Sequence, residues 1–234
     1  MVLPVSTSAD VAGSHATVAV LPVGSFEQHG DHLPLATDTI IASLIADVVT
    51  ETYGLLRLPP ITISCSHEHA AYAGTISISA STLIHIVKEV QVSLERQAID
   101  HLVIVSGHGG NYVLSNIVQE ANTVSRRMAL FPGNGVVEAA RADAAMESSL
   151  HEDMHGGEWE TSIMLHYFPK LVGSQYRDRD WPAPDRRHLL TVGMDGYTET
   201  GIIGFPSLAT PAKGAAAIAS LRESFADVLK VLRV

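Results

Sequence analysis

Residues 18–38 read VAVLPVGSFEQHGDHLPLATD and join two contrasting patterns. The first six residues form an almost continuous apolar run that ends at Gly24, which is typical of a strand buried in a parallel sheet. The remainder places carboxylate and imidazole side chains close together, a mixture that packing alone does not explain. Imidazole nitrogen and carboxylate oxygen are the ligands that Zn²⁺, Mn²⁺ and Fe²⁺ take in proteins. The pattern therefore predicts a divalent metal site after a buried strand.

Apolar runs and helix-period patterns alternate along the rest of the chain. Further strands are expected at 55–63, where Pro59 and Pro60 break the strand, and at 75–79, 102–105 and 128–131. Helices are expected at 40–53, 82–97, 111–127, 136–150, 158–167 and 211–232. Thr37 or Asp38 could cap the first of these helices. Residues 173–206 are rich in Asp, Arg, Pro and Gly and are expected to form a long ordered loop region. This alternation indicates one α/β domain over residues 1–234, with a parallel or mixed sheet and helices on both faces.

The composition narrows the class of protein. The chain has 234 residues, a net charge of -10 and 46% hydrophobic residues, which is typical of a globular protein. The acidic balance argues against nucleic acid as a partner, because phosphate binding needs a basic face. Cys65 is the single cysteine, so no intramolecular disulfide can form, and a cytoplasmic location is expected. Neither a signal peptide nor a membrane-spanning run is recognisable, so no membrane partner is expected.

Two more polar clusters lie downstream, GHGGN at 107–111 and HGGEWETS at 155–162. In parallel α/β sheets, ligands bind beyond the carboxyl ends of the strands. Residues 24–38 follow one expected strand and residues 107–111 follow another. The clusters are therefore expected to meet at one edge of the sheet.

The individual residues allow more than one interpretation. Glu27 and His29 point the same way in extended backbone, so both could reach one metal centre. Asp38 could bridge two ions or cap a helix. His108 could be a ligand, or its segment could be an anion-binding loop that opens a helix. Asn111 could be a helix cap or a substrate contact.

The third cluster offers candidates for proton transfer and for a further ligand. His155 is a candidate general acid or substrate contact. Glu158 and Glu160 stand at an expected helix start, where acids are also favourable through the helix dipole. Only one of the two needs to be a metal ligand. The HEH segment at 67–69 could bind metal but is favoured as a pocket wall.

The combined order of these motifs resembles the creatininase (creatinine amidohydrolase) family. The matching segments are GSFEQHGDHLPLATD at 24–38, GTIS at 74–77, SGHGGN at 106–111 and HGGEWETSIML at 155–165. The GHGGN form is closer to members such as a formamide hydrolase acting on a formylaminopyrimidine ribotide than to creatininase proper. The resemblance implies a three-layer α/β/α sandwich with a mostly parallel central sheet. It also implies two divalent metal ions per subunit (Zn, Mn or Fe), a small-molecule substrate and a homo-oligomer such as a hexamer.

The resemblance also implies roles for individual residues. The positions that match metal ligands are Glu27, His29, Asp38 and His108, with Asp38 as the bridge. Creatininase proper has a glutamate at the place of Gly110, so Glu160 is expected to supply the remaining carboxylate. His155 matches a histidine that assists the chemistry, and His155 or Glu158 is expected to protonate the leaving nitrogen. The expected substrate-binding residues are His67, Glu68, Gly109, Gly110 and Asn111.

These roles predict a metal-dependent amidohydrolase that cleaves a non-peptide C–N bond, an amide or formamide, of a small heterocyclic metabolite by metal-activated water. Creatininase proper has tryptophans where this chain has Glu152, Asp153 and Met154, which argues against creatinine itself. The alternatives are a cyclic-amide hydrolase, a peptidase for a short modified peptide and a metal-binding module without turnover. A nucleotide-binding protein is disfavoured, because the sequence contains neither a Walker lysine nor a GxGxxG pattern.

Overall fold

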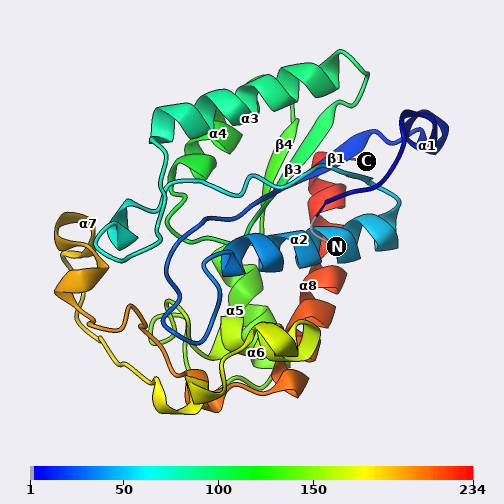
Figure 1. Cartoon of the computed structure of the whole chain (residues 1–234). Helices are drawn as coiled ribbons and strands as arrows, with labels where there is room; N and C mark the ends of the chain where they lie inside the picture. The colour runs from blue at the N-terminus through cyan, green and yellow to red at the C-terminus, as the bar shows by residue number, and fades with distance from the viewer. Residues whose placement is uncertain (1–2, 234) are drawn as a thin grey trace.

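The computed structural model describes residues 3–233, and a parallel sheet lies at its centre (Figure 1). The sheet has four strands in the order β2-β1-β3-β4. They are β1 (Val18–Val23), β2 (Leu56–Arg57), β3 (His101–Ser106) and β4 (Met128–Phe131). All six residues of β1 are buried, as the apolar run predicts for a strand covered on both faces. The predicted α/β/α arrangement is confirmed.

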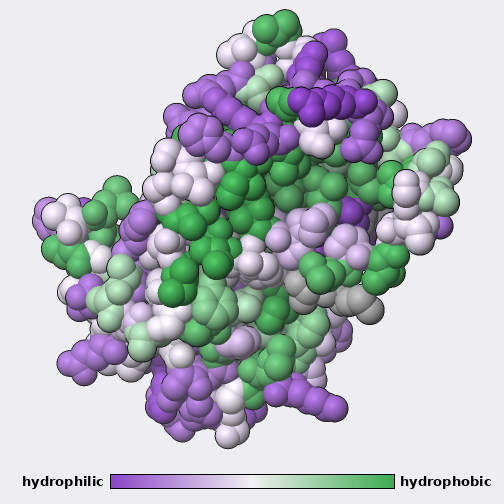
Figure 2. Space-filling view, turned by 45° about the horizontal axis from the view of Figure 1, so that its top comes forward, coloured by the Kyte–Doolittle hydropathy of each residue, from purple (hydrophilic) through white to green (hydrophobic). Residues whose placement is uncertain are grey.

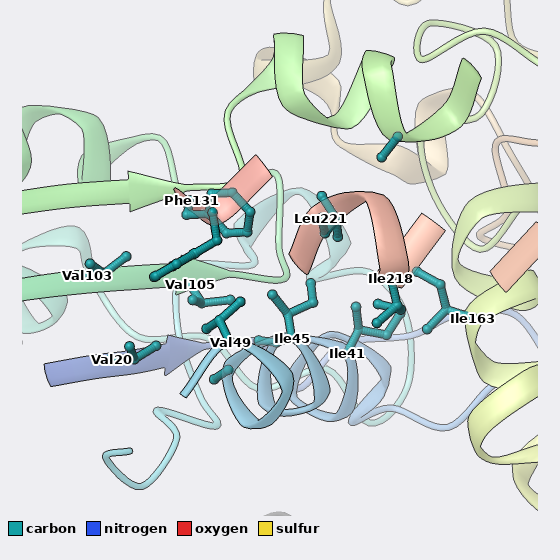
Figure 3. Packing of buried hydrophobic residues seen from close by; sticks show 14 of the residues in the cluster. Val20, Ile41, Ile45, Val49, Val103, Val105, Phe131, Ile163, Ile218 and Leu221 are labelled. Carbon is teal, nitrogen blue, oxygen red and sulfur yellow. The ribbon is translucent and has the colours of Figure 1, made fainter. Parts of the chain in front are cut away.

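Successive residues of each strand point to opposite faces of the sheet, so their side chains pack into two separate hydrophobic cores. On one face, Val20 and Val103 pack against four helices. These are α2 (Thr37–Tyr53), α5 (Asn134–Asp143), α6 (Glu158–Tyr167) and α8 (Pro211–Leu232). Figure 3 shows strand residues Val20, Val103, Val105 and Phe131 facing Ile41, Ile45 and Val49 of α2 and Ile218 and Leu221 of α8. Each such fully buried side chain stabilises the fold by about 1.5–3 kcal/mol.

The opposite face is covered by α3 (Ala80–Glu95) and α4 (Val113–Ala121). Here the other set of strand residues, including Leu21 and Ile104, packs against Leu83 of α3 and Leu114 of α4. Ser79 caps α3, since its hydroxyl accepts a hydrogen bond from the Thr82 amide. The two cores hold the carboxyl ends of β1 and β3 side by side, and these ends carry the polar loops.

Several elements are shorter than the sequence predicts. α4 ends at Ala121 rather than near residue 127, because the Asn122 side chain accepts hydrogen bonds from the amides of Arg127 and Met128 and turns the chain into β4. α5 likewise ends at Asp143 rather than near residue 150.

The strands predicted at 55–63 and 75–79 are also reduced. β2 contains only two residues, because Pro59 and Pro60 follow and cannot donate ladder hydrogen bonds. The 75–79 segment forms a single antiparallel bridge, between Phe26 and Ile76. The helix-cap prediction was wrong: α2 is preceded by Ala36 at its N-cap, and no side chain caps it.

The region 173–206 is irregular, as predicted, and folds back against the polar loops. It contains only short elements: η3 (Ser174–Asp178), α7 (Leu189–Val192) and η4 (Met194–Gly196). Ile203 forms a bridge with His155, and the Thr198 carbonyl accepts a hydrogen bond from the Tyr72 hydroxyl. The remaining short helices are α1 (Ser8–Ser14), η1 (His67–His69), η2 (Pro169–Leu171) and η5 (Pro206–Leu208).

The surface is hydrophilic over α3 at the top of the molecule, whereas apolar side chains gather across the middle of the face seen in Figure 2. Large apolar side chains that are exposed include Tyr112, Leu171 and Leu190. Within residues 3–233, no helix combines the length and the apolar character that crossing a membrane requires.

Candidate metal centre

Five predicted ligands converge at the carboxyl ends of β1 and β3. Glu27 and His29 come from the loop after β1, and Asp38 lies in the first turn of α2. His108 comes from the loop after β3, and Glu160 from the first turn of α6. The relative exposure of the Glu27, His29 and Asp38 side chains is at most 1%. Buried carboxylates and imidazoles at such density need compensating partners.

A glycine lets two of these segments approach one another. A Cβ atom added to Gly107 would lie 2.3 Å from the Asp38 carbonyl oxygen, so only a residue without a side chain fits there. The close contact brings the end of β3 against the start of α2. His108 and Asp38, 70 positions apart in the sequence, therefore meet.

The first potential ligand set contains Glu27, Asp38 and His108. His108 Nδ1 lies 3.1 Å from Glu27 Oε1 and 3.2 Å from Asp38 Oδ2. The Ser25 hydroxyl donates a hydrogen bond of 2.8 Å to Asp38 Oδ2, which orients this carboxylate. Two carboxylates and one imidazole are suitable ligands for a divalent cation.

The second set contains His29, Asp38 and Glu160. His29 Nε2 lies 3.0 Å from Asp38 Oδ1 and 3.8 Å from Glu160 Oε1. The other oxygen of Glu160 accepts a hydrogen bond from the Gly156 amide. Asp38 thus presents one oxygen to each set, the geometry expected of a carboxylate that bridges two ions.

Backbone contacts fix the orientation of both imidazoles. His29 Nδ1 donates to the Glu27 carbonyl at 3.0 Å, and His108 Nε2 donates to the Cys65 carbonyl at 2.9 Å. The remaining nitrogen of each ring therefore presents a lone pair to the carboxylates when the ring is neutral. This is the usual arrangement of a metal-ligating histidine, in which one nitrogen binds the ion and the other donates to a carbonyl.

The Glu27 carboxylate indicates that this cluster of potential ligands fits a cation. Both of its carboxylate oxygens are buried, and within the described part of the chain neither accepts a hydrogen bond. A buried carboxylate without donors is costly unless a cation compensates it. The donor set, its burial and the orientation of the two imidazoles thus fit divalent ions.

The electrostatics of the cluster favour positive charge at its centre. Burial lowers the pKa of His29, but Asp38 and Glu160 outweigh this effect and hold its pKa well above the usual value. The pKa of His108 is raised in the same way, because Glu27 and Asp38 outweigh burial. Burial raises the pKa of Asp38, but the two histidines hold it well below its usual range.

His155 lies beside the first two ligands. Its Nε2 donates to the Gln28 carbonyl at 2.6 Å, and its Nδ1 lies 3.6 Å from Glu27 Oε1. Burial, followed by the neighbouring His29, lowers the pKa of His155, so the ring is neutral and Nδ1 can accept a proton. His155, Glu27 and His29 also form a third metal-capable group.

His69 is a member of the cluster that the sequence prediction did not include. Its Nε2 lies 3.3 Å from Glu27 Oε1, and its Nδ1 contacts the Gln28 side-chain amide at 2.9 Å. Its ring centroid lies 4.3 Å from that of His155, and the two ring planes are tilted by 46°. The HEH segment at 67–69 was the available signal, but it did not show which histidine faces the carboxylates.

Glu158, predicted as a possible proton donor, lies in a different network from the metal-capable cluster. Its side chain is buried and accepts hydrogen bonds from Lys213 Nζ at 2.5 Å and from the Ser148 hydroxyl at 2.5 Å. Within residues 3–233, its hydrogen-bond and ion-pair partners do not include a member of the metal-capable cluster. Lys213 and Ser148 hold its pKa below the usual value although burial raises it.

The predicted substrate-binding residues divide between two cavities. Gly109 and Asn111 line a cavity of about 640 Å³ that also contacts His108 and Glu160. His67, Glu68 and Gly110 line a cavity of about 580 Å³ next to α7. His67 itself is exposed.

Asn111 does not cap α4, because Tyr112 occupies the N-cap position and no side chain caps the helix. Instead, its Oδ1 accepts a hydrogen bond from the Cys65 amide at 3.2 Å. Since the Cys65 carbonyl accepts the hydrogen bond from His108, Asn111 supports the position of that ligand.

The sequence and fold match known proteins. The family model described as creatininase, creatinine amidohydrolase, matches residues 6–229. A mycofactocin precursor peptide peptidase of Mycolicibacterium smegmatis is 33% identical over 228 residues, which are 93% of this chain and 86% of the relative. A 2-amino-5-formylamino-6-ribosylaminopyrimidin-4(3H)-one 5'-monophosphate deformylase of Methanothermus fervidus is 30% identical over 195 residues, 82% of this chain and 66% of the relative.

A solved structure has the same fold. It is a mutant creatininase described as Zn-Zn type, which matches with a TM-score of 0.78 and 25% sequence identity. The match covers 95% of this chain and 93% of that chain.

Proposed function

The chain belongs to the creatininase family of amidohydrolases, and we propose that it hydrolyses an amide or formamide C–N bond of a small metabolite with two divalent metal ions. The observation that carries the proposal is the shared position of Asp38, whose two oxygens face His29 and His108 on opposite sides. Glu27, Asp38 and His108 would hold one ion, and His29, Asp38 and Glu160 the other. Zinc, manganese and iron all suit these ligands.

The bound ions would supply Lewis acidity, which activates water and polarises an amide carbonyl. The chain's own residues supply orientation and proton transfer. His155 offers Nδ1 as the proton acceptor toward the cluster and would return the proton to the leaving nitrogen. His69 orients the Glu27 carboxylate from the other side.

The finer choice of substrate lies between two candidates. The sequence favours a formamide, and the similarity to a deformylase supports it. The second candidate is an amide of a short modified peptide, and the match to a peptide peptidase over 93% of the chain supports that alternative. A formyl group is so small that a formamide substrate needs no pocket on the carbonyl side of the scissile bond. The structure, however, has two cavities, one on each side of the loop that carries His108. That arrangement favours a substrate with bulky groups on both sides of the bond.

A panel of formamides, lactams and short peptides tests the proposal. Protein loaded with Zn²⁺ or Mn²⁺ is expected to release amine from at least one class. Treatment with a chelator is expected to abolish turnover, and added metal to restore it. Binding of two ions without turnover of any class would favour the metal-binding module instead.

The protein is also proposed to form a homo-oligomer such as a hexamer, as the family resemblance implies. The apolar area in Figure 2 and the exposed Leu171 and Leu190 support an interface between copies. Light scattering coupled to size-exclusion chromatography measures the mass directly, and a monomer of 25.0 kDa at micromolar concentration would contradict this proposal.

A further inference from the structure

The cavity of about 580 Å³ beside α7 lies next to the candidate metal centre. Glu68 lines this cavity, and its Oε1 lies 3.5 Å from Nε2 of His108. His108 in turn places its other nitrogen against Glu27 and Asp38. A ligand in this cavity would therefore lie next to the reaction centre.

The cavity combines an apolar wall with negative charge. Glu68 and Asp195 contribute carboxylates, and the described residues that line it include neither lysine nor arginine. Its apolar wall is made by side chains from the turn after η1, the start of α3, the start of α4 with its preceding residue, and α7: Ala70, Ala71, Ala80, Tyr112, Val113, Leu189, Leu190 and Val192. An apolar, anionic cavity favours a cation with an apolar body and disfavours an anion.

Glu68 faces the cavity and keeps capacity to accept a hydrogen bond from a ligand. Its side chain is 12% exposed, and its Oε1 lies 3.5 Å from His108 Nε2, a nitrogen that already donates to the Cys65 carbonyl at 2.9 Å. A Cβ atom added to Gly110 would lie 1.9 Å from Glu68 Oε1, so the glycine provides the space that this carboxylate occupies. A largely buried carboxylate whose nearby donor is shared with a carbonyl gains from a charged donor supplied by a ligand.

We propose that this cavity binds the part of the substrate that carries a protonated amine on an apolar body, with Glu68 as the specificity-determining partner. The inference rests on the proposed amidohydrolase function and specifies its substrate class. It disfavours substrates with a phosphate group, because the single arginine among the described residues lining the larger cavity, Arg141, is paired with Asp153 at 2.8 Å.

The test compares a cationic probe with its neutral isostere. Phenethylamine and 2-phenylethanol share the same apolar body, and calorimetry on the metal-loaded protein measures their dissociation constants without turnover. Phenethylamine is expected to bind about tenfold more tightly than the alcohol, the ratio typical of one charge-assisted contact. Glu68→Gln is expected to remove that preference and to leave binding of the alcohol unchanged.

Two further variants keep the result interpretable. Glu51→Gln removes one negative charge from an exposed position late in α2 and is expected to have no effect on either probe. Asp195→Asn is expected to weaken phenethylamine binding about threefold, since its carboxylate is exposed and more strongly screened. Thermal unfolding shows whether each variant is folded.

A second pair of probes identifies the source of the amine. Phenylalaninamide presents the amino group of a peptide terminus, and its N-acetyl form lacks the charge. Preference for the charged member of either pair, lost in Glu68→Gln, supports the proposal, and the pair with the larger ratio identifies the source. Equal binding of charged and neutral members in both pairs, or an unchanged preference in folded Glu68→Gln, overturns it. Absence of amide turnover would contradict the proposed function but would leave this binding result intact.

Discussion

His29 and Asp38 lie nine positions apart in the sequence, yet His29 Nε2 is 3.0 Å from Asp38 Oδ1 and both side chains are buried. The other oxygen of Asp38 faces His108 at 3.2 Å. One carboxylate therefore links two potential ion sites, so its loss should affect both.

Asp38→Ala is expected to lose both metal ions and at least 100-fold in activity, because neither remaining set has enough anionic ligands. Elemental analysis of the purified protein measures the metal content. Asp100→Ala, at an exposed position before β3, is the control and should keep the wild-type content. Two ions per chain in Asp38→Ala would contradict the shared role.

His69→Ala is expected to lower the metal affinity of the site that contains Glu27 by about 10- to 100-fold, the usual effect of removing a group that orients a metal ligand. The reason is the 3.3 Å contact between His69 Nε2 and Glu27 Oε1. Competition with a chelating dye measures the affinity. His67→Ala removes the exposed imidazole of the same turn and should leave the affinity unchanged.

Glu158→Gln and Glu160→Gln are expected to behave oppositely. Glu158→Gln should keep its metal content and activity but lose about 1–3 kcal/mol of unfolding free energy, because Lys213 and Ser148 lose their charged partner. Glu160→Gln should lose one of two ions and most of the activity, because its carboxylate faces His29. Urea titration and metal analysis of both variants separate the two roles, and an inactive, metal-replete Glu158→Gln would support the catalytic role predicted for Glu158.

Gly110→Ala is expected to lower metal affinity and to destabilise the fold by about 1–3 kcal/mol through overpacking. The added Cβ would lie 1.9 Å from Glu68 Oε1 and 2.4 Å from His108 Nε2, and the His108 ring is held by the Cys65 carbonyl. Gly109→Ala is the matched control, since no atom beyond its own chain neighbours lies within 4 Å of its added Cβ. The double variant with Glu68→Ala should recover part of the loss, and full additivity would show that the two positions do not interact.

Metal affinity is expected to rise with pH between 6 and 8. The pKa values of His29 and His108 are raised, so a metal must displace their protons before it binds. For the chelator-treated protein, the contribution of these histidines to folding stability falls as the pH rises, opposite to the trend in metal affinity. Stability from these two histidines is complete below about pH 6.5, the unfolded value, and is lost as the pH rises through the folded pKa values. Thermal unfolding with and without Mn²⁺ should therefore show a larger stabilisation at pH 8 than at pH 6, and an equal shift at both values would contradict this account.

Local patterns predicted much of the architecture. The apolar run of β1 and the bounds of α6 and α8 match the structure, because each depends on short-range periodicity and local turn residues. The ends of α4 and the extent of β2 do not match. The end of α4 depends on the Asn122 side chain, which the periodicity does not register. The sequence marked Pro59 and Pro60 as a break in the strand, but only the structure shows that β2 is confined to the two residues Leu56–Arg57.

The sequence by itself determined which segments gather at the sheet edge, because parallel strands place the loops that follow them together. Only the tertiary structure decided which side chain of each segment faces the cluster. His67 and His69 lie on a 3₁₀ turn, whose residues project about 120° apart, so His69 meets Glu27 while His67 remains exposed. Glu158 and Glu160 lie on an α-helix, where residues two apart point about 200° away from each other. One of these acids therefore joins the metal-capable cluster and the other pairs with Lys213, a choice set by how α6 packs rather than by the spacing of its acids.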